Sequence, residues 1–326
     1  MLDSAANREK TGVALLSVIS NTVLVILKLI VGVLIGSVSV ISEAIHSGMD
    51  LLAAGLALFA VRQAGRPADR DHPYGHGKVE NISGTVEALL IFVAAGWIVY
   101  EAVRKISHPE PLEAIGWGIG VMALSALLNT VVSEMLFRVG RRTDSVALTA
   151  DAWHLRTDVW TSAGVSLSLL AIWLGERFAP EANLHWLDPA AAILVAVLIT
   201  HAALKLTAQA ARDLLDWSLP PDEEGWIREH LRGLTPSVCG FHRLRTRKSG
   251  AVRFIDMHLL VDEDMHVHRA HAIADEVSER IHEHLPGSSV IVHIEPCAGK
   301  CEPDCLAGCV LTEAQRTAVK LRHPHA

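Results

Sequence analysis

The chain has 326 residues, of which 50% are hydrophobic and only 20% are charged, and its mean hydropathy is +0.31. This composition argues against an ordinary soluble domain and predicts a membrane protein. The net charge of −7 and the pI near 6.2 argue against nucleic acid as a partner, which would favour a basic surface.

Six stretches are apolar enough to cross a bilayer, which requires about 20 mostly apolar residues. The polar N-terminus MLDSAANREK lacks the small-residue cleavage site of a signal peptide, so the first stretch is expected to stay as a span. We predict transmembrane helices at 12–35, 38–62, 79–104, 114–138, 146–175 and 187–208.

The basic residues of the loops predict the orientation of these helices. Those near 8–10, 62–78 and 138–142 fall on one side of the membrane, against Arg104, Lys105 and Arg177 on the other. The positive-inside rule assigns the first group to the cytoplasm. We therefore expect a multi-pass protein of the cell inner (plasma) membrane, with both termini and everything after about residue 209 in the cytoplasm.

Two of the predicted spans carry a histidine followed four residues later by an aspartate. HSGMD supplies His46 and Asp50, and HLRTD supplies His154 and Asp158. Residues i and i+4 share one helix face, and at about 1.5 Å per residue both pairs reach the middle of a core about 30 Å thick. Two imidazoles and two carboxylates from facing helices form a four-ligand shell of the kind that zinc accepts.

Hydrogen bonding between helices, without any metal, is the alternative explanation for these polar residues. A charge at the bilayer centre costs at least about 2.5–3.5 kcal/mol, and the repetition of the pattern at matched depth favours ion coordination. An acidic residue precedes each histidine by three positions, Glu43 in one span and Asp151 in the other. These acids either orient the imidazoles or act only at the helix ends and near the pore.

With these motifs the chain resembles the cation diffusion facilitators, a family of proton-coupled exporters of divalent metals. The resemblance covers residues 10–297 and rests on HSGMD, HLRTD, DRDHPYGHGKVE, GFHRLRTR, IDMHLLVD and VIVHIEP. It implies a homodimer of six-helix protomers, alternating access driven by protons, and a transport site between helices two and five. The four transport ligands would be His46, Asp50, His154 and Asp158.

The cargo implied by the resemblance is zinc, because members with two histidines and two aspartates at this site look mostly like zinc transporters. A site of four carboxylates would lean toward manganese. Imidazole also suits zinc and its neighbours better than magnesium or calcium. Affinity order alone does not fix selectivity, so iron, cobalt, cadmium, nickel and manganese stay open as cargo.

The loop ADRDHPYGHGK contains a second group of candidate ligands. Asp69, His72 and His76 match the loop metal site of the family, and Gly75 and Gly77 give the backbone freedom to bring them together. A solvated loop with no metal is the alternative. Lys78 resembles the family residue that pairs with an aspartate across the hinge between the two domains, here Asp216.

After the sixth span the composition becomes charged and alternating, which predicts a small α+β domain. We predict a helix at 222–233, strands at 240–247 and 252–261, a helix at 266–285 and a strand at 289–295. This αββαβ order suits a two-layer domain, and the resemblance implies a ferredoxin-like fold.

The resemblance also implies a cytoplasmic metal site in this domain. Its positions are occupied by His242, His258, His271, His293 and Glu295, where some members carry an aspartate in place of the glutamate. A metal that bridged two protomers here would hold the dimer together and sense cytoplasmic metal. The other histidines of the domain are interpreted as solvated.

The tail departs from the family pattern. PCAGKCEPDCLAGC places Cys297, Cys301, Cys305 and Cys309 at a constant spacing of four. Four thiolates in a reducing compartment indicate a tetrahedral zinc site, although such sites usually begin with C-x2-C. Redox-active or inert cysteines are the alternative. Pro303 argues against one straight helix with a single cysteine stripe.

We therefore predict three regions and a secondary active transporter, not an enzyme. The regions are a transport domain at 1–210, a metal-binding and dimerisation domain at 211–296, and a Cys-rich tail at 297–326. Because metal and protons compete for the same ligand atoms, one site suffices for antiport. The rivals are an intramembrane metallohydrolase, disfavoured because H-E-x-x-H is missing from the sequence, and a zinc-binding sensor or scaffold that transports nothing.

Overall fold

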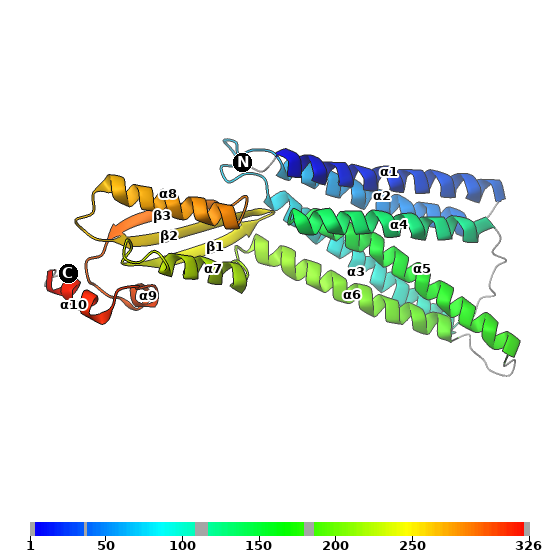
Figure 1. Cartoon of the computed structure of the whole chain (residues 1–326). Coiled ribbons are helices and arrows are strands. Elements are labelled where there is room, and N and C mark those ends of the chain that lie inside the picture. The colour runs from blue at the N-terminus through cyan, green and yellow to red at the C-terminus, as the bar shows by residue number, and fades with distance from the viewer. Residues whose placement is uncertain (1–3, 36–37, 108–116, 179–185, 323–326) are drawn as a thin grey trace. The chain divides into compact units, whose positions relative to one another are not determined.

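A computed structural model describes residues 4–35, 38–107, 117–178 and 186–322. The chain divides into two compact units, Met1–Arg212 and Asp213–Ala326, and each is described by itself. The first unit is helical, and the second contains a three-stranded sheet (Figure 1). The tail after residue 296 lies in the second unit.

The first unit consists of six long helices. They are α1 (Ser4–Ile35), α2 (Val38–Ala64), α3 (Lys78–Ser107), α4 (Trp117–Arg142), α5 (Val146–Phe178) and α6 (Leu187–Leu214). Among the described residues, five stretches have the length and apolarity of a membrane span, and they lie in every one of these helices except α5. At 33 residues α5 also has the length to cross, although its first half carries Asp151, His154 and Asp158. The predicted membrane domain of six helices is confirmed.

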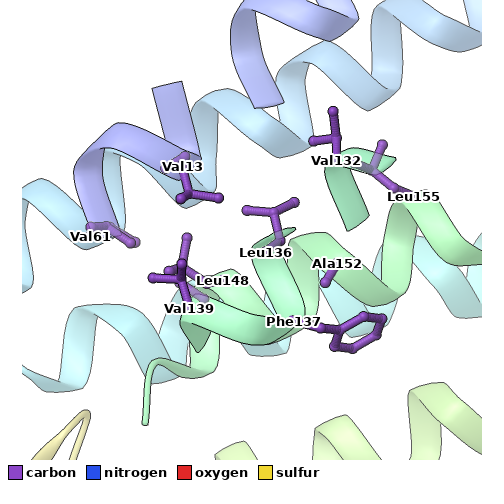
Figure 2. Close-up of a cluster of buried hydrophobic side chains, with 12 residues drawn as sticks. Val13, Val61, Val132, Leu136, Phe137, Val139, Leu148, Ala152 and Leu155 are labelled. Carbon is purple, nitrogen blue, oxygen red and sulfur yellow. The ribbon is translucent and has the colours of Figure 1, made fainter. Parts of the chain in front are cut away.

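Small and branched side chains hold these helices together. Figure 2 shows Val13 of α1 and Val61 of α2 beside Leu136 of α4 and Leu148 of α5, in a cluster that is almost fully buried. In α2 the buried residues are largely alanines, which let neighbouring backbones approach closely. Large apolar side chains such as Leu34 and Val93 lie on the outside, where lipid would cover them.

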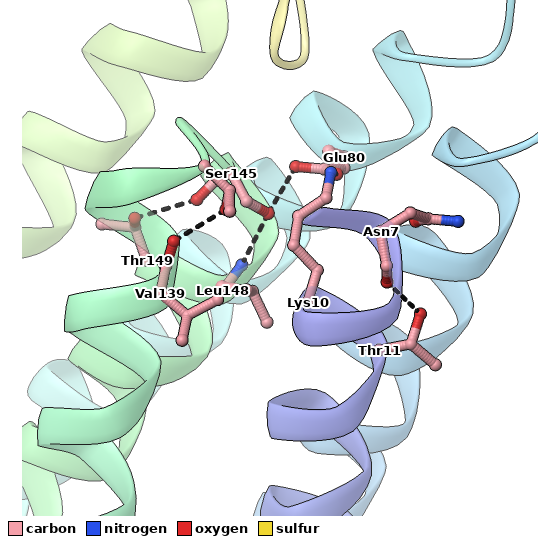
Figure 3. A network of polar contacts seen from close by, with 9 residues as sticks. Asn7, Lys10, Thr11, Glu80, Val139, Ser145, Leu148 and Thr149 are labelled. Atoms are coloured by element: carbon pink, nitrogen blue, oxygen red, sulfur yellow. Dashed lines mark hydrogen bonds and ion pairs between the residues drawn. The ribbon is translucent and has the colours of Figure 1, made fainter. Parts of the chain in front are cut away.

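A buried polar network joins α1, α3 and the start of α5 (Figure 3). The Lys10 ammonium lies 2.8 Å from Glu80 Oε1, and both side chains are almost completely buried. Ser145 donates a hydrogen bond of 2.5 Å to the other carboxylate oxygen of Glu80. Each oxygen of the buried carboxylate therefore has a partner, which fixes the register between these three helices.

The second unit has the predicted αββαβ order followed by two short helices. Its elements are α7 (Pro221–Arg232), β1 (Gly240–Ser249), β2 (Val252–Val261), α8 (Val267–His284), β3 (Ser289–Pro296), α9 (Pro303–Ala307) and α10 (Glu313–Arg322). The strand order is β1-β2-β3, with β1 antiparallel and β3 parallel to the central strand. The parallel connection runs through α8, as a crossover requires.

One face of the sheet forms the core of this unit. Ile255, Met257 and Leu259 alternate along β2 and pack with Ile227 of α7 and Val277 of α8. Because successive strand residues point to opposite faces, the residues between them lie on the other face, away from the helices. The predicted ligands of β2 and β3 occupy that second face.

Candidate metal sites

The two His-x3-Asp patterns meet between α2 and α5. His154 of α5 lies with Nε2 3.1 Å from Asp50 Oδ1 of α2, and His46 of α2 lies with Nε2 4.0 Å from Asp158 Oδ1 of α5. Each histidine is thus paired with the aspartate of the other helix. Ligand atoms of His46, Asp50 and Asp158 all lie within 4.8 Å of one another, as the ligands of one ion must.

The candidate ligands of this site differ in exposure. Asp50 and His154 are 4% and 7% exposed, whereas the His46 side chain is 55% exposed. Within the described part of the chain, Nδ1 of His154 is buried and has no hydrogen-bond partner. The structure therefore brings three of the four predicted ligands together, and His154 joins them only through its contact with Asp50. Imidazole nitrogens and carboxylate oxygens are the donor types that a four-coordinate zinc site uses.

Two further carboxylates lie beside His154. Asp151 is one helical turn earlier on α5, and Glu87 comes from α3; both are fully buried and interact electrostatically with His154. Ser83 donates a hydrogen bond of 3.1 Å to Glu87 Oε1. Asp151 was expected from the sequence but Glu87 was not, although a lone glutamate inside an apolar span was a usable signal. The side chain of Glu43 lies outside the described residues.

The loop between α2 and α3 brings its three predicted ligands together. Asp69 Oδ1 lies 3.2 Å from His72 Nδ1, and Asp69 Oδ2 lies 3.3 Å from His76 Nε2. Gly75, at φ +82°, allows the tight turn between the two histidines. His76 is buried, and its Nδ1 has no hydrogen-bond partner among the described residues. The cluster offers two nitrogens and a carboxylate and leaves further coordination open.

The carboxylate of this loop is held in its charged form by the backbone. The N–H groups of His72 and Asp71 donate hydrogen bonds of 2.7 and 3.0 Å to Asp69 Oδ1. The bond from His72 is the main cause that holds the pKa of Asp69 below its ordinary value. A deprotonated carboxylate is the form that binds a metal.

The third cluster lies across the strands of the sheet. His242, His258 and His293 occupy matching positions on β1, β2 and β3, and Glu295 follows two residues later on the same face. One carboxylate oxygen of Glu295 lies 2.9 Å from His242 Nε2, and the other lies 2.8 Å from His258 Nδ1. His293 Nε2 is more exposed and lies 3.5 Å from Glu295 Oε1.

Burial and hydrogen bonding shift the pKa of Glu295 in opposite directions. Burial disfavours its charged form, but the hydrogen bonds with His242 and His258 hold the pKa of Glu295 below its ordinary value. His271 does not join the cluster: it lies on α8, is exposed, and has Nε2 3.7 Å from Asp275. Because the helices cover the opposite face of the sheet, one protomer brings together only four of the five predicted ligands.

The predicted tail cysteines lie around a cavity of about 200 Å³, together with Cys239. Burial and the neighbouring charges of Cys297, Cys309 and Cys301 raise the pKa of Cys305 to about 11. A hydrogen bond with Cys297, with burial, raises the pKa of Cys239 well above its ordinary value. Cys239 was not expected at this site from the sequence, because β1, β2, α8 and β3 separate it from the tail along the chain.

Two family profiles together match most of the chain. The profile described as the cation efflux transmembrane domain matches residues 14–215, and the profile described as the cytoplasmic domain of cation efflux proteins matches residues 219–297. The helical unit and the sheet each correspond to one of these profiles.

Curated relatives match over most of their own length. An uncharacterized transporter of Synechocystis sp. is 36% identical over 261 residues, which cover 80% of this chain and 82% of the relative. The cation-efflux pump FieF of Yersinia pestis is 34% identical over 278 residues, which cover 85% and 89%. A solved chain of CzrB, described as a candidate zinc transporter, is 34% identical and covers 24% of this chain and 98% of its own length, with a TM-score of 0.24.

Proposed function

The chain belongs to the cation efflux family, and from this premise we propose that it exports a divalent transition-metal cation, zinc foremost, in exchange for protons. The observation that carries the proposal is the crossed pairing of His46 with Asp158 and of His154 with Asp50 between α2 and α5. The relative from Yersinia pestis is named a cation-efflux pump, which agrees with this direction of transport.

The donor set supports a transition metal as cargo. Imidazole nitrogens suit zinc, iron, cobalt and nickel, whereas magnesium and calcium prefer shells made only of oxygen. Two histidines and two aspartates match the tetrahedral shell of zinc most closely. Iron, cobalt, cadmium, nickel and manganese are the competing cargoes.

Proton exchange follows from the atoms that the metal uses. The hydrogen bond between His154 Nε2 and Asp50 Oδ1 requires a proton on that nitrogen or oxygen. A metal that binds these two atoms displaces the proton. When the metal leaves, a proton must return, because an unbalanced carboxylate is costly inside a membrane. A more acidic exterior therefore favours metal release, and alternating access moves metal outward as protons enter.

The loop and sheet clusters are proposed to bind zinc without transporting it. Asp69, His72 and His76 would capture metal at the cytoplasmic surface. The His242–His258–Glu295 cluster, with His293 beside it, would sense cytoplasmic zinc and stabilise a homodimer. His271 would complete such a site only from a second protomer. In this proposal both termini and the second unit are cytoplasmic, and the protein lies in the inner membrane.

The test is transport by the purified chain in lipid vesicles that contain a zinc-reporting dye. With an imposed pH gradient, we expect zinc flux that follows the gradient and vanishes in Asp158→Ala. Asp71→Ala is the matched control, because its carboxylate lies outside the three clusters. The same assay with iron(II), cobalt, cadmium, nickel and manganese ranks the cargoes.

Two outcomes would contradict the proposal. If the folded protein binds zinc but moves none of these metals, it is a sensor or scaffold and not a transporter. If zinc flux is unaffected by the pH gradient, the protein transports metal without proton exchange.

A further inference from the structure

The Cys-rich tail pairs with the free edge of β1. Gly240 and Cys309 form an antiparallel bridge, Phe241 N–H donates to Gly308 O at 3.2 Å, and Val310 N–H donates to Cys239 O at 3.1 Å. These bonds extend the sheet by one short strand beyond β1. The tail is therefore folded onto the domain through backbone hydrogen bonds.

Glycines make this contact possible. A Cβ at Gly308 would overlap the carbonyl oxygen of Phe241, and a Cβ at Gly240 would lie 3.0 Å from Gly308 O. Gly299 has φ +75° and lies against α10, where an added Cβ would be 3.2 Å from Lys320 Cα. At these three positions a larger side chain would meet the neighbouring backbone.

This folding places cysteines from three separate parts of the domain around one cavity. Cys239 N–H donates to Leu260 O and Cys297 N–H donates to Val261 O, so the two residues flank the end of β2 on either side. Cys309 sits in the added strand next to Cys239, and Cys305 lies on α9. All of these cysteines line the same cavity of about 200 Å³.

The backbone places four of these cysteines differently from the fifth. Cys239, Cys297 and Cys309 lie at the edges of the strands and Cys305 lies on α9, whereas Cys301 lies outside the helices and strands. Cys297 and Cys309 interact electrostatically with both Cys239 and Cys305, so they connect the strand side of the cavity with α9. Cys301 is a neighbour of Cys305, and its backbone is in the left-handed region at φ +48°.

We propose that this cavity is a metal site, in which the thiolates of Cys239, Cys297, Cys305 and Cys309 bind one thiophilic divalent cation of the zinc and cadmium class. Four thiolates form the tetrahedral shell that structural zinc sites use. Each bound thiol gives up one proton to solvent. Cys239 replaces Cys301 in the ligand set that the tail spacing indicated.

The site closes when the ion binds. In the described residues, three groups of candidate ligands each have ligand atoms within 4.8 Å of one another. None of these three groups contains a cysteine. The thiol side chains therefore rotate toward the cavity to reach the ion. His242 and Glu295 also line this cavity, so the thiolate site and the His242–His258–Glu295 cluster are neighbours in one domain.

Cobalt(II) binding to the full chain in detergent tests the ligand set directly. Sulfur-to-cobalt charge transfer gives a near-ultraviolet band that histidine and carboxylate sites lack, so the other clusters do not contribute to it. We expect Cys239→Ser to lower this band by about one quarter and to weaken cobalt binding by at least about 10-fold. Cys301→Ser is the matched control and should retain the full band.

A measurement on the unmodified chain covers the case in which Cys239→Ser fails to fold. Alkylation with iodoacetamide, read by peptide mass spectrometry, should show that zinc protects Cys239, Cys297, Cys305 and Cys309 and leaves Cys301 reactive. Equal alkylation of Cys239 with and without zinc would overturn the proposal. Disulfides among these cysteines in reducing buffer, or loss of the cobalt band in Cys301→Ser alone, would also overturn it.

This proposal fails or succeeds separately from transport. Asp158→Ala is expected to abolish zinc flux and to leave the sulfur-to-cobalt band unchanged. If the transport proposal is wrong, the thiolate band remains; if the thiolate proposal is wrong, zinc flux remains.

Discussion

At the residue scale, the intramembrane site depends on which atoms face one another across two helices. Each helix supplies one histidine and one aspartate as candidate ligands, and each pairs with the opposite type on its neighbour. His46 is the most exposed of the four ligands, so replacing it disturbs the buried packing least. It is therefore the position at which ligand chemistry can be changed with the fewest other effects.

We expect His46→Asp to shift selectivity from zinc toward manganese. The change replaces an imidazole by a hard carboxylate, and shells richer in oxygen favour manganese over zinc. Zinc and manganese flux in vesicles should show a fall of at least about 10-fold in the zinc-to-manganese ratio. His76→Asp, the same substitution in the loop cluster, should leave the ratio unchanged. An unaltered ratio in His46→Asp would show that this residue does not select the cargo.

We expect Glu295 to affect how the sheet responds to acid. Its pKa lies below the ordinary value of 4.5 in the folded chain, despite burial, because His242 and His258 hydrogen-bond to its charged form. A group with a lowered folded-state pKa stabilises the fold above its unfolded pKa and loses that contribution as the pH falls through its folded value. In metal-free protein, the amides of β3 should therefore be better protected in the wild type than in Glu295→Gln above pH 4.5.

Hydrogen exchange of β3 peptides in the full chain, compared at matched pH, measures this difference. The protection of the wild type should converge on that of Glu295→Gln as the pH falls below 4.5. A gap that stays constant through this range would mean that the charge of Glu295 does not stabilise the strand.

At the scale of elements, buried contacts fix how helices and strands align. The Lys10–Glu80 pair joins α1 to α3, and removing one partner leaves a buried charge unbalanced. We expect Glu80→Ala to lower the free energy of unfolding in detergent by about 3–5 kcal/mol. The double variant Lys10→Met with Glu80→Leu should recover most of this loss. Disruption of the exposed Glu134–Arg138 pair by Arg138→Ala should cost less than about 1 kcal/mol.

The added strand of the tail can be tested without touching a cysteine. Gly308→Ala places a methyl group against the carbonyl oxygen of Phe241, so the tail should detach from β1. Limited proteolysis of the full chain should then cut within 297–322 much faster than in the wild type. Gly225→Ala is the control, because a Cβ there meets no atom within 4 Å. Unchanged proteolysis in Gly308→Ala would show that the tail is not held through this strand.

Elements that depend on local periodicity were predictable from the sequence, whereas contacts between distant elements were not. Hydropathy identified the spans, but α1 begins at Ser4 and not at residue 12, because a helix continues into water beyond its apolar segment. Alternation identified β2, but not that His242, His258 and His293 share one register. Glu87 is recognisable in the sequence as an acid inside an apolar span, but only the packing of α3 shows that it lies beside His154. Cys239 reaches the tail cysteines only because the tail returns to β1.

At the scale of the whole molecule, the proposed transport site and the other proposed metal sites of the strands and tail lie in different units. The crossed His–Asp site lies entirely within Met1–Arg212, and the sheet cluster and the thiol cavity lie within Asp213–Ala326. In the mechanism proposed above, cargo and protons would be exchanged at the first unit alone. The direction of transport would then be set by the two gradients across the membrane and not by the protein.

Reversal of the pH gradient is therefore expected to reverse the zinc flux. Metal and protons compete for the same nitrogen and oxygen atoms, so zinc should leave the compartment into which protons flow. In vesicles with equal zinc on both sides, the dye signal should rise under one gradient and fall under the opposite one. Collapse of the gradient by a proton-carrying ionophore should stop net flux in both cases. Net flux that keeps one direction under both gradients would mean that protons do not share the ligands of the metal, and that coupling requires a separate path.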